Sequence, residues 1–423
     1  MRQFINKKTN CQLSTVNCQF KKVSLFILFA LYTSCVAAQD AIQWRGTDRT
    51  GIYNETGLLK SWLSGGPELL WYFDKLGEGH SSIAISNDKI YATGLIDGKG
   101  YLFVFDMNGK LLNKKEYGSE WSESYNGARG TVTINNGKLY VYSGTGNLTC
   151  FDEISLNIIW KKNIVSDLKG TNVRWGVNES PLIVGEKVII TPGGKTNNVV
   201  ALNKNTGAMI WSCAGHGDNP AYCSPLYLDA QEIKQIVTIT EKHILGIEAE
   251  TGKMLWSFPY NNMRNIHPNT PIYGGDNMLL CVFGYGKGSV MLRLTNGGRG
   301  VEKVWENKEF DSKTGSAVKI GNYVYGSGDN HKYWFCLDWK TGEQKYKDRT
   351  LGVGNVIAVD DMLYCYSEKG EMALVRATPE KFDLVSQFPI TMGTEQHWAH
   401  PVIYKGVLYV RHGNTLMVYK IKN

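Results

Sequence analysis

The sequence lacks the short motifs that would assign it directly to an enzyme class. It has no glycine-rich phosphate loop, no nucleophile elbow and no catalytic-triad motif. Its nine cysteines form no CxxC or CxxCH motif and, with the histidines, show no spacing typical of a metal site. These absences argue against a P-loop enzyme, an α/β-hydrolase, a c-type haem protein and a zinc-binding module.

A strong charge of one sign is also lacking once the N-terminus is set aside. The chain has 46 basic and 39 acidic residues, a formal net charge of +7. Residues 1–38 hold five of the basic residues and no acidic one, so the remainder carries 41 minus 39, or +2. A nearly neutral protein gives no electrostatic reason to expect nucleic-acid binding.

Long hydrophobic runs are absent apart from one N-terminal segment. There Lys21 and Lys22 precede the apolar run Val23–Leu31, and small residues follow as far as Ala38. The run is too short to span a bilayer comfortably, so residues 1–38 are predicted to be a signal peptide cleaved after Ala38. We expect an exported, periplasmic protein. Secretion, or lipid anchoring through Cys35, is the alternative.

Six cysteines remain after this cleavage. Four of them lie within the apolar segments and are expected to be small buried hydrophobic residues: Cys150, Cys281, Cys336 and Cys365. Cys213 and Cys223 flank one loop, and an oxidising compartment would allow a disulfide across it. The sequence leaves that pairing open.

What the chain does contain is an internal repeat. A two-residue apolar step recurs eight times, with spacings of 49, 49, 48, 43, 45, 39 and 45 residues. The steps begin at Ile90, Leu139, Val188, Ile236, Leu279, Val324, Leu363 and Leu408. A period near 45 residues with four short strands in each unit is typical of a β-propeller blade. One blade cannot bury both faces of its sheet, so the units must stack in a ring.

The repeat predicts an all-β fold: an eight-bladed β-propeller of four-stranded antiparallel blades. The last unit, from His400 to Lys420, has only three strands, whereas the segment Leu69–Phe73 has the pattern of a fourth strand. We therefore expect this N-terminal strand to complete blade eight and close the ring. The expected organisation is a signal peptide at 1–38, an irregular leader at 39–65 and the propeller at 66–423.

A recurrent turn joins the third and fourth strands of the units. It reads Ala201 to Trp211, Gly246 to Trp256 and Cys336 to Tyr346, with an Asn, Glu or Asp at the third position and Thr-Gly in the middle. The polar side chain can accept hydrogen bonds from the turn backbone, and Gly permits a left-handed conformation. The tryptophans that follow such turns are predicted to be structural and to dock on the next blade: Trp71, Trp160, Trp211, Trp256 and Trp305.

This A-x-D-x-x-T-G-x-x-x-W phrase resembles the tryptophan-docking repeat of the PQQ-like, or quinoprotein-type, β-propellers, over about residues 66–423. One branch of that family contains alcohol and sugar dehydrogenases that use pyrroloquinoline quinone and calcium. Another contains cofactor-free propellers, including the lipoprotein of the bacterial outer-membrane assembly machine. The opening from Trp44 to Gly51, followed by Gly57-Leu58-Leu59 and Trp62, looks like the leader of a further group of exported bacterial PQQ-like propellers.

The resemblance to the dehydrogenase branch has specific gaps. Those enzymes typically place two adjacent cysteines by the quinone, and this chain has none. Their calcium ligands have no match beyond Glu179. The resemblance therefore implies the cofactor-free branch, and quinone with calcium is the alternative.

Candidate ligand-binding residues lie in the loops that enter each innermost strand, because these loops gather at one mouth of a propeller channel. They are His80, Arg129, Arg174, Glu179, Tyr222, His267 and His400. Glu179 is expected either to form an ion pair with Arg174 or to act as a general acid or base. His80, His397 and His400 are not expected to hold a metal, because their spacing does not suit one strand face and no carboxylate pair accompanies them. No catalytic residue is identified.

The sequence thus favours an exported, monomeric binding or scaffolding module with its ligand at the channel mouth. An oligosaccharide or a protein is the expected partner, and an anionic ligand suits the polar loops. Two alternatives stay open. One is a periplasmic enzyme of sugar or polysaccharide degradation, either a quinone-dependent dehydrogenase or a propeller lyase. The other is an assembly factor for outer-membrane proteins.

Overall fold

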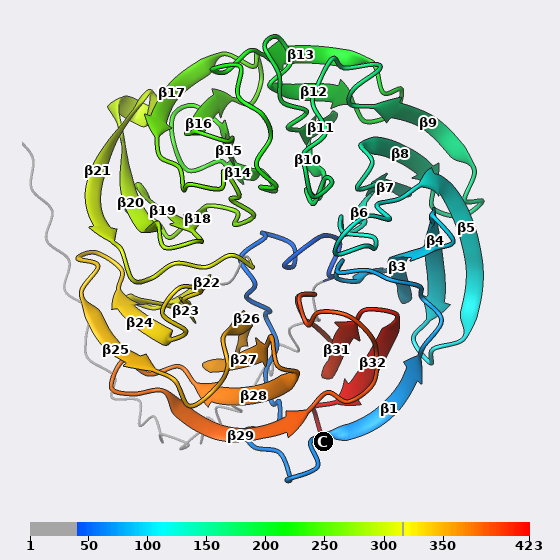
Figure 1. Ribbon diagram of the computed structural model, residues 1–423, viewed down its shortest axis with the longest axis vertical. Coiled ribbons are helices and arrows are strands. Elements are labelled where there is room, and N and C mark those ends of the chain that lie inside the picture. Colours follow the sequence, from blue (N-terminus) through cyan, green and yellow to red (C-terminus); the bar gives the residue numbers. More distant parts are fainter. Residues whose placement is uncertain (1–39, 315–316) are drawn as a thin grey trace, which may run out of the picture. The chain divides into compact units, whose positions relative to one another are not determined.

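Eight four-stranded antiparallel sheets form a ring in the computed structural model, which describes residues 40–314 and 317–423 (Figure 1). The eight-bladed propeller predicted from the repeat is therefore confirmed. Blade one comprises β2 (Ala84–Ser86), β3 (Lys89–Ile96), β4 (Lys99–Asp106) and β5 (Leu111–Ser119), and blade two comprises β6 (Thr133–Asn135), β7 (Lys138–Tyr142), β8 (Asn147–Asp152) and β9 (Ile158–Asn163). Blade three comprises β10 (Leu182–Val184), β11 (Lys187–Ile190), β12 (Val199–Asn203) and β13 (Met209–Cys213), and blade four comprises β14 (Leu226–Leu228), β15 (Gln235–Ile239), β16 (His243–Glu248) and β17 (Met254–Pro259).

The second half of the chain repeats the same order. Blade five comprises β18 (Ile272–Tyr273), β19 (Met278–Phe283), β20 (Gly288–Thr295) and β21 (Gly300–Asn307), and blade six comprises β22 (Ala317–Ile320), β23 (Tyr323–Ser327), β24 (Trp334–Asp338) and β25 (Gln344–Asp348). Blade seven comprises β26 (Gly354–Val359), β27 (Met362–Ser367), β28 (Glu371–Arg376) and β29 (Asp383–Pro389). Blade eight comprises β30 (Val402–Tyr404), β31 (Val407–His412) and β32 (Thr415–Lys420), together with β1. A 3-10 turn, Asn296–Gly298, joins β20 to β21.

The ring closes through β1 (Glu68–Phe73), which pairs with β32 as the outer strand of blade eight. Leu69 lies opposite Tyr419 and Phe73 opposite Leu416. The predicted closure is confirmed, with the strand starting one residue earlier than the sequence pattern indicated. Closure joins the two ends of the propeller and leaves no unpaired blade.

The outer strands carry a β-bulge immediately before the docking residue. In blade three, for example, Ala201 pairs with Trp211 while the next residue, Leu202, pairs with Met209, so Ile210 has no partner. The extra residue directs two consecutive side chains outward and turns the following tryptophan toward the neighbouring blade. The bulge also disrupts the free edge, which protects it against pairing with other chains.

Four of the five docking tryptophans, all but Trp256, donate to a carbonyl oxygen in the turn of the next blade. The indole Nε1 of Trp160 donates to the carbonyl oxygen of Lys204 at 3.0 Å, and that of Trp211 donates to Ala249 at 3.2 Å. The turn glycine opposite Trp160, Gly207, has φ +70°, and a Cβ there would lie 2.8 Å from the indole. Glycine is therefore required twice, for the turn and for the close approach of the ring.

Trp256 docks differently from the others. Its Nε1 donates to Oε1 of Gln235 at 2.8 Å, and Nε2 of Gln235 donates to the carbonyl oxygen of Gly298 in the next blade at 2.9 Å. Gln235 is fully buried and acts as a relay between blades four and five. Blade five has the 3-10 turn in place of the Thr-Gly turn, so Trp256 reaches it through Gln235 rather than by a direct hydrogen bond.

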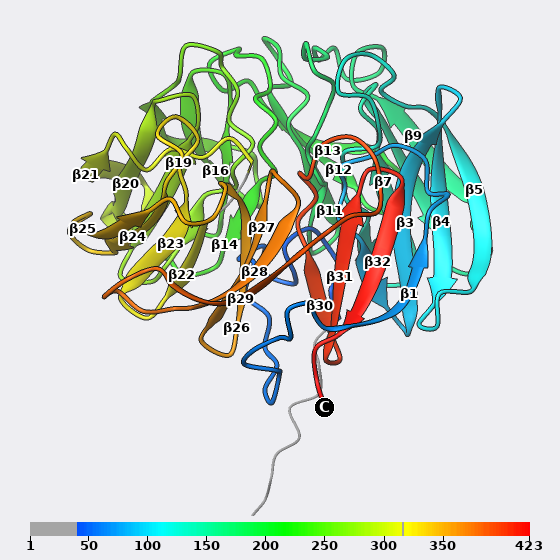
Figure 2. The ribbon, with the colours of Figure 1, turned by 60° about the horizontal axis from the view of Figure 1, so that its bottom comes forward.

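The irregular leader is a central plug. Residues 40–67 run beneath and across the ring in Figures 1 and 2, on the face that also carries the C-terminus. Its backbone bonds to the innermost strands of three blades, because Ile85 and Ile134 donate to Ala41 and Ile42 at 2.9 and 2.8 Å, and residue 52 bridges Ala358. The sequence predicted only an irregular lead-in.

Two leader arginines make further contacts with the ring. Arg49 Nη1 donates to the carbonyl oxygens of Ser180 and Pro225, both at 3.0 Å, which belong to the entries of blades three and four. Arg45 Nη1 bonds to the carbonyl oxygen of Val356 at 3.4 Å and to His400 Nδ1 at 3.2 Å. Both guanidinium groups are buried. One segment thus ties both halves of the ring together.

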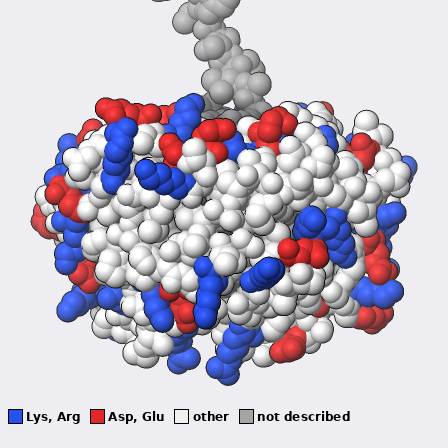
Figure 3. Space-filling view, turned by 90° about the horizontal axis from the view of Figure 1, so that it is seen from above, with Lys and Arg blue, Asp and Glu red and all other residues white. Residues whose placement is uncertain are grey.

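The remaining sequence predictions about surface and cysteines have mixed outcomes. All six cysteines from Cys150 onward are buried free thiols, so the disulfide left open between Cys213 and Cys223 does not form. On the wall seen in Figure 3, acidic and basic residues are interspersed with uncharged surface. Within residues 40–314 and 317–423, no helix has the length and apolar character needed to cross a membrane. The predicted signal peptide and Cys35 lie outside the described residues.

Candidate functional site: a cationic, aromatic cavity at the channel mouth

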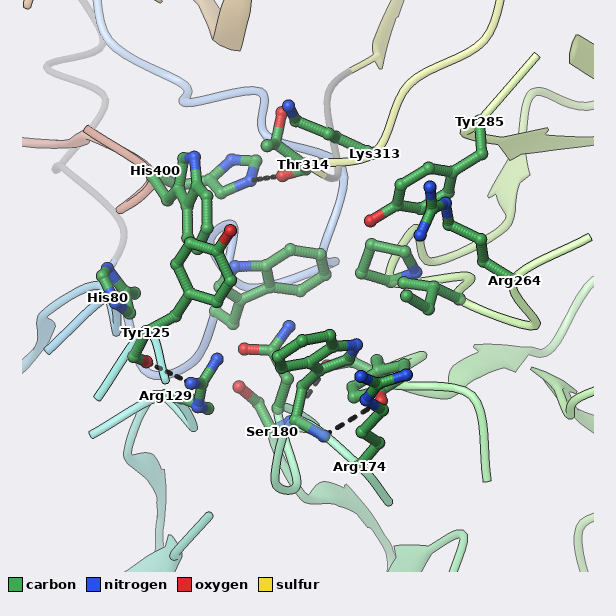
Figure 4. A pocket seen from close by; sticks show the side chains of 18 residues that line it. His80, Tyr125, Arg129, Arg174, Ser180, Arg264, Tyr285, Lys313, Thr314 and His400 are labelled. Carbon is green, nitrogen blue, oxygen red and sulfur yellow. Dashed lines mark hydrogen bonds between the residues drawn. The ribbon is translucent and has the colours of Figure 1, made fainter. Parts of the chain in front are cut away.

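A cavity of about 530 Å³ occupies the channel mouth opposite the leader. Its lining residues come from the entry loops of all the blades except blade seven, from one turn within blade five and from the tip of the leader (Figure 4). The volume falls in the range of ordinary small-molecule sites, roughly 300–1,000 Å³. The lining contains no aspartate or glutamate. It contains the basic residues Arg129, Arg174, Arg264 and Lys313, two histidines, and the aromatic residues Trp44, Tyr125, Trp175, Tyr222, Tyr285 and Trp398.

The leader closes the channel below the cavity. Trp44 lines the cavity and packs edge-on against His400, with ring centroids 5.2 Å apart. Behind it, Arg45 donates to His400 Nδ1, and His400 Nε2 donates to the carbonyl oxygen of Thr314 at 2.9 Å. Both nitrogens of His400 are therefore engaged within the protein. Burial, reinforced by the charge of Arg45, lowers the pKa of His400 to about 3, so the imidazole is neutral.

Three of the four cations form no ion pair among the described residues. None of the ion pairs within the described part of the chain includes Arg129, Arg174 or Arg264, whereas Lys313 contacts Asp329 and Glu368 at 3.2 and 3.3 Å. Arg174 lies over the ring of Trp175 at 4.8 Å. Arg264 lies over the ring of Tyr285 at 5.4 Å. Aromatic faces thus hold these guanidinium groups while leaving their N–H groups available.

Arg129 is the most buried of these three cations. Its Nη2 donates to the carbonyl oxygen of Tyr125, while its Nε is buried and has no hydrogen-bond partner within residues 40–314 and 317–423. Burial lowers its pKa to about 10, although Glu120 and Tyr222 act to raise it. The group remains charged at neutral pH. A buried charged donor without a partner is costly unless a ligand or water meets it.

The three tyrosines that line the cavity share an unusual backbone conformation. Tyr125, Tyr222 and Tyr285 have φ values of +55°, +74° and +60°. They are the only aromatic residues with positive φ in the described chain. A bulky side chain in this region costs on the order of 1–3 kcal/mol, and such strain tends to concentrate at functional sites.

Five of the seven residues singled out from the sequence line this cavity: His80, Arg129, Arg174, Tyr222 and His400. The other two lie behind it. Both Glu179 oxygens accept from the backbone N–H of Thr191, at 3.1 and 3.0 Å, and the expected ion pair with Arg174 does not form. Burial raises the pKa of Glu179 to about 8, against the opposing effects of Thr191 and Arg49. The charged residue near Glu179 is thus the leader's Arg49.

His267 is also placed in the protein interior. Its Nε2 lies 3.1 Å from the carbonyl oxygen of Glu241, and its Nδ1 lies 3.3 Å from Asn262 Nδ2. Burial lowers its pKa to about 4. It therefore braces the loop that carries Arg264 rather than facing the cavity.

Several lining residues were not among the candidates named from the sequence. Tyr125 and Arg264 lie in entry loops like the residues that were named, so the same loop argument could have found them. Tyr285 lies in the turn between β19 and β20, and Trp44 lies in the leader. No local pattern places either one at the channel.

Comparison with known proteins gives the family. The model of the family described as outer membrane protein assembly factor BamB matches residues 98–348. The chain belongs to this family of PQQ-like β-propellers. No curated protein matches.

Solved structures similar to this PQQ-like propeller include BamB and quinohemoprotein and methanol dehydrogenases. BamB from Moraxella catarrhalis is 17% identical with a TM-score of 0.61, over 84% of this chain and 99% of that one. The quinohemoprotein alcohol dehydrogenase from Comamonas testosteroni is 11% identical with a TM-score of 0.65, over 90% and 80%. A europium-containing methanol dehydrogenase is 12% identical with a TM-score of 0.61, over 89% and 90%. At these identities the likeness shows the fold alone.

The cavity of this PQQ-like propeller does not fit a quinone held with calcium. Calcium takes oxygen ligands, carboxylates foremost, and the lining has no carboxylate. Glu179, the one residue matched to the calcium set, points to the Thr191 backbone instead. Within the described residues no group of three or more histidine, cysteine, aspartate or glutamate side chains is arranged to hold a metal.

Proposed function

We propose that this PQQ-like propeller is an exported binding protein whose cavity holds an acidic saccharide. The observation that carries the proposal is the set of three arginines, Arg129, Arg174 and Arg264, which form no ion pair within residues 40–314 and 317–423 and converge on a cavity without acidic residues. Arginine presents a planar fork of donors that matches a carboxylate or sulfate group. The indole and phenol rings around it offer flat apolar faces with polar edges, which suit a sugar ring.

Three titratable groups that line the cavity favour binding over catalysis. Burial lowers the pKa values of both His80 and His400 to about 3, and His400 uses both its nitrogens within the protein. Burial raises the pKa of Tyr222 to about 12. A general acid or base works best with a pKa near the working pH. None of these three groups meets that condition.

Isothermal titration calorimetry tests the proposal. The purified protein is titrated with trigalacturonate and, as the neutral counterpart, maltotriose. We expect binding of the acid alone, weakened at least about tenfold in Arg174→Ala, as for the loss of a hydrogen bond to a charged group. The matched control is Arg293→Ala, which removes an exposed arginine paired with Glu302 on the outer wall. Equal binding of both saccharides, or of neither, would refute the proposal.

The same mixtures address the enzymatic alternative. Chromatography after prolonged incubation would reveal a shortened or oxidised saccharide if the protein were a lyase or a dehydrogenase. We expect the saccharide to be recovered intact.

A second candidate is an assembly factor for outer-membrane proteins, which the family match favours. The outer wall offers a surface for a protein partner, because the bulged strands of four consecutive blades expose pairs of aliphatic residues. The pairs are Leu69 and Leu70, Leu111 and Leu112, Ile158 and Ile159, and Met209 and Ile210, each 38–47% exposed. Crosslinking in cells with a photoreactive residue at Ile159 would capture an assembly protein if this candidate is right, and Arg293 on blade five is the control position.

A further inference from the structure

The cavity contains three similar recognition units, each with one strained tyrosine and one arginine free of a carboxylate partner. The first is Tyr125 with Arg129, linked by the hydrogen bond from Arg129 Nη2 to the Tyr125 carbonyl. The third is Tyr285 with Arg264, linked by the stacking of the guanidinium over the ring at 5.4 Å. Figure 4 shows these two units on opposite sides of the cavity.

The second unit, Tyr222 with Arg174, is linked through Trp175. The backbone N–H of Trp175 donates to the Tyr222 hydroxyl at 3.3 Å, and the Arg174 guanidinium lies 4.8 Å from the Trp175 ring centroid. The Trp175 ring also meets Tyr125 at 5.7 Å. The first and second units therefore form a continuous aromatic wall.

The phenol of Tyr285 interacts electrostatically with the phenols of both Tyr125 and Tyr222. Burial raises the pKa of Tyr285, and the phenol of Tyr125 adds to the rise. Burial likewise raises the pKa of Tyr222, and Tyr285 contributes in the same direction while Arg129 and Arg174 oppose it. The units thus belong to one cavity rather than to three separate surface sites.

Backbone strain distinguishes these tyrosines from packing residues. A tyrosine kept only for packing gains nothing from a left-handed backbone, and glycine at the same position would remove the cost. The other non-glycine residues with positive φ are mostly Asn and Asp at turns, which tolerate it well. Three separate loops each hold a tyrosine in this costly conformation, and all three tyrosines line the same cavity. The strain thus coincides with the cavity at all three positions.

We propose that the three tyrosine–arginine units are separate subsites for one ligand with several negative charges, an acidic oligosaccharide of more than one charged sugar. Each arginine takes one carboxylate or sulfate, and each tyrosine stacks on or bonds to the adjoining sugar ring. This inference rests on the proposed function and adds how many charged groups the ligand carries and which residues bind each of them. A monosaccharide acid fills one unit only. Two arginines then remain without an anion, and the buried donor of Arg129 stays without a partner whenever its own unit is empty.

Calorimetry with galacturonate, digalacturonate and trigalacturonate tests the number of subsites, and a heparin-derived disaccharide separates sulfate from carboxylate recognition. We expect affinity to rise at least about tenfold from the monomer to the trimer, because each added charge gains charge-assisted hydrogen bonds. Arg264→Met should bring the affinity for the trimer close to that for the dimer. Equal affinity for monomer and trimer would overturn the three-subsite inference while leaving anion binding in place. Binding of no acid would overturn both.

Glycine substitutions test the role of the tyrosines independently of the arginines. In Tyr285→Gly the strain is removed together with the ring, so we expect an unchanged or higher melting temperature and an at least tenfold loss of affinity for trigalacturonate. Lys405→Gly is the control, since Lys405 has φ +52° in a turn between β30 and β31 and does not line the cavity. It should keep full affinity. A clearly lower melting temperature for Tyr285→Gly, with affinity retained, would mean that the ring serves packing alone and would overturn the inference.

Discussion

Replacing Arg49 tests whether the leader holds the propeller together. The Arg49→Ala change removes the donors for the carbonyl oxygens of Ser180, Pro181 and Pro225. Thr133 Oγ1 also donates to Pro181 at 2.7 Å, so two of the three carbonyls are left without the arginine's hydrogen bond or a substitute among the side chains. At about 1–3 kcal/mol for each buried group that loses its partner, the loss is about 2–6 kcal/mol.

The expected loss can be followed by urea denaturation and by thermal melting. With an unfolding entropy of about 2.1 cal/mol/K per residue, a propeller of this size loses about 1.2 °C per kcal/mol. The melting temperature of Arg49→Ala should therefore fall by about 2–7 °C. The melting temperature of Arg49→Lys should lie between those of Arg49→Ala and the wild type. A single ammonium group cannot reach acceptors from two blades as the planar guanidinium fork does.

The control is Arg376→Ala, which removes an exposed arginine that contacts Asp383 at 3.1 Å. Exposed ion pairs contribute about 0–1 kcal/mol, so this variant should remain near the wild type. If Arg49→Ala were as stable as Arg376→Ala, the leader would not brace the ring, and its contacts would be incidental to stability. Faster proteolysis within residues 40–67 of Arg49→Ala would provide independent support.

Three further predictions concern pH, blade docking and closure. Burial raises the pKa of Glu179 to about 8, so the folded state holds this proton more tightly than the unfolded state does. The resulting stabilisation is complete below the unfolded pKa, near 4.5, and is lost as pH rises through 8. The urea midpoint of Glu179→Gln should therefore depend less on pH between pH 5 and 8 than that of the wild type. Gln235→Ala breaks the relay from Trp256 to blade five and should cost about 2–4 kcal/mol, whereas Gln387→Ala, at an exposed position on β29, should cost less than about 0.5 kcal/mol; similar urea midpoints would contradict the relay. Deleting Glu68–Phe73 removes the outer strand of blade eight and should lower the urea midpoint sharply, and an unchanged midpoint would show that the ring does not depend on this closure.

The fold could be predicted from the sequence because its determinants are local and repeated. Each apolar step marks the second strand of a blade, and each Asn or Asp of the turn binds the turn backbone. Asn203 Oδ1, for instance, accepts from the N–H groups of Asn205 and Thr206 at 2.9 and 3.0 Å. Eight copies of one pattern make the number of blades readable, and the missing strand of the last copy pointed to β1.

The candidate site was predictable only in outline. The entry loops share one mouth in any propeller, so His80, Arg129, Arg174, Tyr222 and His400 were correctly placed near one another. The direction of a side chain within a loop is set by its neighbours in space. Glu179 and His267 therefore turned inward to satisfy buried backbone groups, although their loops approach the channel.

The sequence by itself determined the eight-bladed ring, its strand order and its closure, because short-range periodicity and turn chemistry encode them. Only the tertiary structure decided that residues 40–67 plug the channel, that Arg45 and Arg49 are buried and that three strained tyrosines meet in one cavity. The contacts of Arg49 with the ring lie more than 130 positions away along the chain. No local pattern records such contacts, because they exist only once the blades have assembled into a ring.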